Sequence, residues 1–178
     1  MAIVINGSGT VTGLAVGGLP DGTVDDGTLA TDSVTAAKLK DDAIAVGDLP
    51  AGSVLQVVTR TFSTSSTTTS TSYTDTDCYV DITPTSTSSK ILIQGSVSGY
   101  SATTGVSAYF KIFRGSTELT VLQRFEDVFL FNVAPIELDS PSSTSSIRYM
   151  LKMKSQNGNS IGVNMSATGI LVAMEIAG

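Results

Sequence analysis

Glycines at positions 7, 9 and 13 follow a short apolar run in "AIVINGSGTVTG", near the N-terminus. A nucleotide-binding loop needs G-x-G-x-x-G at the start of a helix, because the free N–H groups of the helix N-terminus hold the phosphates. Here Thr12 stands where the third glycine would fall, and the next residues, "LAVGGLPDG", would break a helix. No Gly-Lys-Ser/Thr follows either. We therefore interpret Ala2 to Asn6 as a strand that ends in a turn.

Two groups of carboxylates are the other candidates for chemistry. Asp75, Asp77 and Asp81 lie in "DTDCYVD", and Glu126 directly precedes Asp127. The first group lacks the glycine and the terminal glutamate of a calcium-binding loop. Glycoside hydrolysis needs two carboxyl groups that face each other across a cleft, whereas adjacent residues of a strand point to opposite faces. We therefore interpret these acids as surface residues and predict no metal site.

The composition removes most other catalytic chemistry. The 178-residue chain contains no His, no Trp and one Cys. It therefore has neither a Ser-His-Asp nor a Cys-His nucleophile, and no Cys/His zinc site. We predict that the protein is not an enzyme and binds no cofactor. One Cys cannot form an internal disulfide, and we expect Cys78 to be a small core residue in a protein assembled in a reducing cytosol.

Negative charge is concentrated in one segment. From position 21 to 49, seven acids face two lysines, a balance of −5, whereas nine acids face eight bases from position 50 onward. Nucleic acid requires a basic stripe, so we exclude it as a partner. The N-terminus lacks the basic and long apolar regions of a signal peptide. The aliphatic run from Ile170 to Met174 is far shorter than the ~20 residues of a membrane span, so we expect no membrane insertion.

A branched aliphatic residue recurs every five positions through the acidic segment, a period that neither a helix nor a strand explains. The series is Leu14, Leu19, Val24, Leu29, Val34, Leu39, Ile44, Leu49 and Val54. One interpretation is a disordered linker, because one aliphatic in five does not offset roughly 1 to 2 kcal/mol of backbone entropy per ordered residue. The other is a stalk in which three chains share an axis, which the strict spacing favours. Within it, "DSVTAAKLK" is compatible with a short helix capped by Asp32 or Ser33.

From about Leu55 the pattern changes to apolar and polar residues in alternation. It is clearest in "CYVDIT", "GVSAYFKIF" and "IRYMLKMK". The predicted inward residues are Cys78, Val80, Ile82, Val106, Ala108, Phe110, Ile112, Ile147, Tyr149, Leu151 and Met153. The last segment, "GILVAMEIA", is apolar on both faces, so it should lie central in its sheet or against a neighbouring subunit. We predict an all-β domain of eight or nine antiparallel strands without an amphipathic helix, folded as a β-sandwich of jelly-roll type.

Turn residues separate these segments. "RGST" follows Phe113, and Asn157-Gly158 in "QNGN" is the strongest hairpin signal. The hydroxyl-rich stretch from Thr61 to Ser72 fits either a flexible linker or polar strands, and both alternatives stay open.

Several stretches together carry a resemblance. They are "MAIVINGSGTVTGL", the repeats "DGTV", "TDSVTAAKL" and "LPAGSVLQVV", and the later "TPTSTSSKILIQGSVSG", "FKIFRGSTEL" and "ILVAMEIA". The chain resembles the short trimeric fibre proteins of tailed bacteriophages over most of its length, in pattern and without a catalytic signature. The resemblance implies a homotrimer with a docking segment, a repeat-built stalk and an outward β-domain. The long parallel β-helix of phage spikes that cut polysaccharide is missing.

This organisation divides the chain into a virion-docking segment, residues 1–17, an acidic repeat stalk, residues 18–54, and a β-sandwich domain, residues 55–178. Docking would use Ile3, Val4 and Ile5, a strand without an evident partner here, and the stalk axis would run from Leu19 to Val54. The implied partners are other virion proteins and a host-surface glycan or protein, whose contact residues the sequence does not indicate. The protein would be a virion component assembled in the host cytoplasm. A head fibre, capsid decoration or cement protein without a receptor role is the alternative.

Overall fold

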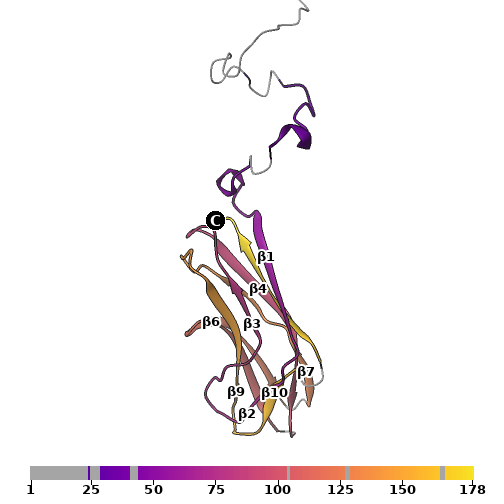
Figure 1. Cartoon of the computed structure of the whole chain (residues 1–178). Coiled ribbons are helices and arrows are strands. Elements are labelled where there is room, and N and C mark those ends of the chain that lie inside the picture. Colours follow the sequence, from indigo (N-terminus) through magenta and orange to yellow (C-terminus); the bar gives the residue numbers. More distant parts are fainter. Residues whose placement is uncertain (1–23, 25–28, 41–43, 104, 127–128, 165–166) are drawn as a thin grey trace, which may run out of the picture. The chain divides into compact units, whose positions relative to one another are not determined.

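The computed structural model describes residues 24, 29–40, 44–103, 105–126, 129–164 and 167–178 (Figure 1). The chain divides into two compact units, Met1–Ile44 and Ala45–Gly178. The described part contains two short 3-10 turns and eleven strands, more than the eight or nine strands predicted. All the strands belong to the second unit.

The repeat segment is built from tight turns. The turns η1 (Ala36–Lys38) and η2 (Val46–Asp48) start ten residues apart. Each is closed by one backbone bond, in which residue 38 donates to the carbonyl of residue 35 and residue 48 to that of residue 45. The short helix suggested for "DSVTAAKLK" forms only as the three-residue 3-10 turn η1. At Asp32 the backbone φ is 59°, which is outside the right-handed helical region.

A second turn recurs at residues 30–33 and 50–53, where the last N–H donates to the first carbonyl at 3.0 and 3.1 Å. The third residue has positive φ in both turns, 59° at Asp32 and 91° at Gly52. Glycine and aspartate tolerate this conformation better than most residues, which explains their presence at positions 32 and 52. The local unit of the described repeats is therefore ten residues long and carries two aliphatics.

The strands of the β-domain are bounded as follows. They are β1 (Val54–Phe62), β2 (Ser66–Thr68), β3 (Tyr79–Ile82), β4 (Lys90–Ser101), β5 (Ser107–Arg114), β6 (Thr117–Glu126), β7 (Leu130–Val133), β8 (Ile136–Asp139), β9 (Ile147–Ser155), β10 (Ile161–Val163) and β11 (Gly169–Ile176). One sheet, the β9 sheet, has the order β3-β9-β5-β6. In the other, the β4 sheet, pairing follows the path β1-β11-β4-β10-β2, and β7 and β8 also pair with β4.

Strand β4 is long enough to pair with two strands on each side. On one side β11 pairs with its first half and β10 with its last residues, and on the other side β8 and β7 do the same. The chain crosses between the sheets at six of the ten connections, and it stays within one sheet at β1–β2, β5–β6, β7–β8 and β10–β11. This winding over two antiparallel sheets confirms the predicted all-β sandwich and has the strand order of a jelly roll. Figure 1 shows the C-terminal strand β11, in yellow, between β1 and β4, as predicted for the last strand.

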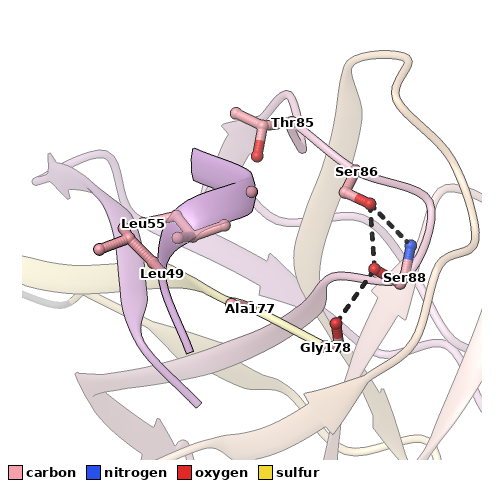
Figure 2. A pocket seen from close by; sticks show the side chains of 8 residues that line it. Leu49, Leu55, Thr85, Ser86, Ser88, Ala177 and Gly178 are labelled. Atoms are coloured by element: carbon pink, nitrogen blue, oxygen red, sulfur yellow. Dashed lines mark hydrogen bonds between the residues drawn. The ribbon is translucent and has the colours of Figure 1, made fainter. Parts of the chain in front are cut away.

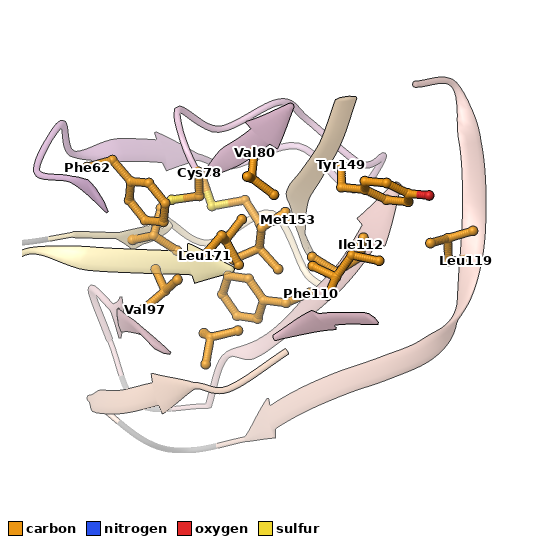
Figure 3. Packing of buried hydrophobic residues seen from close by; sticks show 14 of the residues in the cluster. Phe62, Cys78, Val80, Val97, Phe110, Ile112, Leu119, Tyr149, Met153 and Leu171 are labelled. Carbon is orange, nitrogen blue, oxygen red and sulfur yellow. The ribbon is translucent and has the colours of Figure 1, made fainter. Parts of the chain in front are cut away.

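The core lies between the sheets. Phe110, Tyr149 and Met153 are wholly buried (Figure 3), and of the predicted inward residues only Ile147 is partly exposed. The Phe110 ring makes edge contacts with Phe125 and Phe131, whose own rings stack at 4.3 Å between centroids. Alternation thus identified the core correctly.

Two turn predictions have different outcomes. Gly115 and Ser116 join β5 to β6 as a two-residue hairpin, with φ 56° at Gly115. The hairpin predicted at Asn157-Gly158 is wrong, because this turn joins β9 to β10, which belong to different sheets. The φ of 79° at Gly158 shows that the turn itself forms. The stretch from Thr61 to Ser72 completes β1 and contains β2, so part of it is strand.

Candidate interaction surfaces

The predicted site residues fall into two groups. Ile3, Val4, Ile5 and Leu19 lie outside the described residues. The remaining predicted axis residues, in the order of the chain, are Val24, Leu29, Val34, Leu39, Ile44, Leu49 and Val54. Their exposed fractions run from 38% at Leu49 to 55% at Val54. A single chain therefore leaves all seven of these aliphatic side chains in contact with solvent.

The acids that raised the question of metal binding are engaged in ion pairs. Across the described residues, no group of three or more His, Cys, Asp or Glu is placed to hold a metal ion. Asp127 lies outside the described residues, and Glu126 pairs with Arg124. The other pairs are Asp75 with Lys152 at 2.7 Å, Asp77 with Arg60 at 3.1 Å, and Asp81 with Arg148 at 2.8 Å.

The outer face of the β9 sheet is charged and aromatic. The Tyr79 ring lies between two guanidinium groups, with Arg60 and Arg148 at 3.7 and 3.8 Å from its centroid. Arg148 also donates two hydrogen bonds to Asp81, both at 2.8 Å, and these bonds lower the pKa of the Asp81 carboxyl. Stacked and paired cations of this kind suit a solvated surface, where both the charges and the rings stay hydrated at their edges.

The outer face of the β4 sheet is different. Directly opposite residues of four neighbouring strands form a continuous apolar row across it, namely Val57, Met174, Leu92 and Leu138. Val57 and Leu138, at the two ends of the row, are each 55% exposed. A second row lies beside it and is formed by Thr59, Val172, Gln94 and Ile136. Neither row contains a charged residue.

A bulge extends this face toward the start of β1, where the next row is formed by Val54, Ile176 and the exposed Lys90. Val54 lies opposite Ile176, and the register shifts between Val54 and Gln56. Because opposite residues share a face and Ile176 alternates with Met174, Val54 lies on the outer face, as Val57 does. Without the bulge, the odd spacing from Val54 to Val57 would put them on opposite faces. The sequence showed only that β11 is apolar on both sides and did not indicate this row.

A carboxylate without a cation lies inside the sandwich. Glu175 is wholly buried and accepts four hydrogen bonds from neutral groups. Gln56 Nε2 donates at 2.6 Å, the Thr85 N–H at 2.7 Å, Thr85 Oγ1 at 2.8 Å and Ser89 Oγ at 2.6 Å. Burial acts to raise the pKa of Glu175, but the hydrogen bonds outweigh it and the pKa is lowered. The cluster ties the segment between β3 and β4 to β11, and the sequence did not indicate it.

A pocket of about 250 Å³ opens beside η2 (Figure 2). Leu49 and Leu55 form its apolar side, and Ser88 donates to the carbonyl of Gly178 at 3.3 Å on the other side. No acidic or basic side chain lines it. Its volume is below the range of about 300–1,000 Å³ that is usual for small-molecule sites. No helix among the described residues has the length and apolarity needed to span a membrane.

No protein-family model matches the chain, and no curated protein sequence matches it. Among solved structures, the chain is similar to the VP2 subviral particle of infectious bursal disease virus, with 14% identity, 69% of this chain and 33% of that chain covered, and a TM-score of 0.37. It is also similar to the T=1 particles derived from the same virus, with 12% identity, 68% and 36% coverage, and a TM-score of 0.37. The chain thus spans about a third of the length of these chains.

Proposed function

We propose that this protein is a structural virion protein of a tailed phage, a homotrimeric tail or baseplate fibre. Its N-terminal segment docks on the virion and its C-terminal β-domain is presented for attachment to the host surface. The resemblance of the sequence to short phage fibres supports the proposal. The observation that carries it is the five-residue aliphatic series, whose seven described members are all exposed in a single chain.

Trimerisation would explain why these residues are aliphatic, because it would bury their side chains. If three chains place the series on a common axis, each level buries three side chains. Each fully buried side chain of this kind contributes roughly 1.5 to 3 kcal/mol. A solvated linker would gain nothing from the strict spacing, and its composition would be expected to drift toward polar residues. The recurring turns of the described repeats, with Asp or Gly at the positive-φ position, also favour one regular conformation.

The β-domain suits an exposed fibre tip. It has one continuous hydrophobic core, and the outer face of the β9 sheet carries ion pairs such as Lys111 with Glu118 at 2.6 Å. Such a face is compatible with water and with polar ligands on a cell surface. The host ligand would be a surface glycan or protein, and the described pocket is too small to indicate it.

Particle imaging tests this function. Phage carrying the full chain should show density for the fibre at the tail or baseplate, and phage carrying a chain without residues 1–17 should lack it, although the truncated protein stays folded and trimeric in solution. Loss of the fibre should reduce adsorption to host cells. Density distributed over the head together with normal adsorption would show a decoration protein instead. Normal incorporation of the truncated chain would contradict docking through Ile3, Val4 and Ile5.

A further inference from the structure

We propose that the outer face of the β4 sheet is the surface through which the β-domains of three copies of this chain contact one another. The inference rests on the proposed homotrimer and deepens it by naming the contact residues. The centre of the surface is the apolar row formed by Val57, Met174, Leu92 and Leu138.

The first argument is the difference between the two outer faces of the sandwich. Neither of the two central rows of the β4 sheet contains a charge, and Ile136 and Leu138 at one edge are 56% and 55% exposed. On the β9 sheet, Arg148 pairs with Asp81, and Lys152 pairs with Asp75. Burying such ions in a contact would cost desolvation, whereas burying the apolar row is favourable.

The absence of charge from the two central rows also selects the occupant, and the one lysine of the adjacent row, Lys90, lies at the end of β4 away from the centre. A second copy presents the same two uncharged rows. When these rows of two copies meet, neither buries a charge without an opposite charge beside it. A partner with a charged surface would lose hydration there without gaining an ion pair. The second row would form the rim of this contact, and it mixes apolar Val172 with polar Thr59 and Gln94. Interfaces between proteins commonly have an apolar centre and a polar rim.

The second argument is continuity with the proposed stalk axis. Val54 is the last member of the five-residue series and the first residue of β1. The bulge after it keeps its side chain, 55% exposed, on the same face as Val57. The last residue assigned to the axis therefore lies on the same strand and the same face as Val57 of the apolar row. A contact between copies at Val54 would be continuous with a contact between their apolar rows.

Two matched substitutions in the full chain test the proposal by sedimentation. Leu138→Glu alters the apolar row, and Leu122→Glu makes the same change on β6 of the other sheet, at a residue that is 46% exposed. Both sites are open to solvent in the single chain, so circular dichroism should show folded protein in both cases. The wild type and Leu122→Glu should sediment at three times the 18.3 kDa chain mass, and Leu138→Glu at lower mass. Trimers of all three proteins would overturn the inference and leave the homotrimer intact. A monomeric wild type would overturn the homotrimer itself.

Thiol labelling gives a second measurement that does not depend on dissociation. Cys78 is wholly buried, so a cysteine introduced on the surface is the main reactive thiol of the described chain. In the native full-length trimer, Leu138→Cys should react with a maleimide at least about tenfold more slowly than Leu122→Cys, because a covered site reacts only when it opens. Equal rates would overturn the inference. Fast labelling of purified Leu138→Cys with protection only in whole particles would also overturn it, because another virion protein would then cover the face.

Discussion

Glutamine in place of Glu175 changes one atom of a wholly buried carboxylate and removes its charge. The oxygen Oε1 accepts from the Thr85 N–H, from Thr85 Oγ1 and from Ser89 Oγ, and a glutamine carbonyl can keep these three bonds. The oxygen Oε2 accepts from Gln56 Nε2. If the amide NH₂ of the introduced glutamine replaced Oε2, it would face Gln56 Nε2, which is also a donor.

The magnitude follows from the bonds. A hydrogen bond to a charged group contributes roughly 1.5–3 kcal/mol and a neutral one roughly 0.5–1.5 kcal/mol. Three weakened bonds and one lost bond exceed the relief from burying a neutral group, since the lowered pKa shows that the bonds outweigh burial. We expect Glu175→Gln to lower the free energy of unfolding by about 2–3 kcal/mol. At the roughly 2–4 °C per kcal/mol of a domain this size, the melting temperature falls by about 4–12 °C.

Thermal and urea unfolding at one fixed chain concentration measure the effect, because association makes stability depend on concentration. Glu118→Gln is the control, as it makes the same change at a side chain that is 47% exposed and pairs with Lys111. Glu118→Gln should lower the free energy of unfolding by less than about 1 kcal/mol. Equal losses in the two variants would refute the assignment of Glu175 as a stabilising buried anion.

The pH dependence gives an independent check of the same assignment. The folded pKa of Glu175 lies below the ordinary value of 4.5. Its contribution is therefore present above pH 4.5 and is lost as the pH falls through the folded pKa. The difference in stability between wild type and Glu175→Gln should shrink as the pH is lowered below 4.5. A difference that stays constant down to pH 2 would contradict the lowered pKa.

Two further predictions concern the stalk and the β4 sheet. Protease cleavage between positions 21 and 50 should accelerate when an axial pair of residues is replaced by Asp, because three copies of each carboxylate would be crowded and poorly solvated, and an off-axis pair should change it little. The axial pair is Val34 with Leu39 and the off-axis pair is Thr31 with Thr35. Equal cleavage of wild type and both variants would indicate a solvated linker. Gly95→Ala should destabilise the domain by about 2 kcal/mol or more in urea unfolding, because its Cβ would lie 2.4 Å from the Ile170 carbonyl oxygen. A Cβ added at Gly47 has no atom within 4 Å, so Gly47→Ala should change the free energy of unfolding by no more than about 0.5 kcal/mol. A similar loss of stability in both variants would contradict the close approach of Gly95 to Ile170.

The sequence alone predicted which side chains of the β-domain face inward. Alternation is a property of the extended chain itself, so Val80 and Ile82 could be assigned to the core before any pairing was known. The same local reasoning identified the turn at Asn157-Gly158 but not what the turn connects. Two strands on either side of a turn can pair or can separate into two sheets, and the core contacts of β9 and β10 decide this.

The sequence by itself therefore determined the all-β class, the inward faces of the strands, the five-residue aliphatic period and the absence of histidine-based chemistry. Only the tertiary structure decided which acids pair with which bases, because Asp81 and Arg148, which are 67 residues apart in sequence, meet across two paired strands. It also decided that Glu175 is buried, although its position in "VAMEIA" gives no sign of this. The apolar row became visible only when Val57, Met174, Leu92 and Leu138 came into register. A local pattern indicates which side chains of one strand face the core. A surface formed by several strands depends on the register between them, which long-range packing sets.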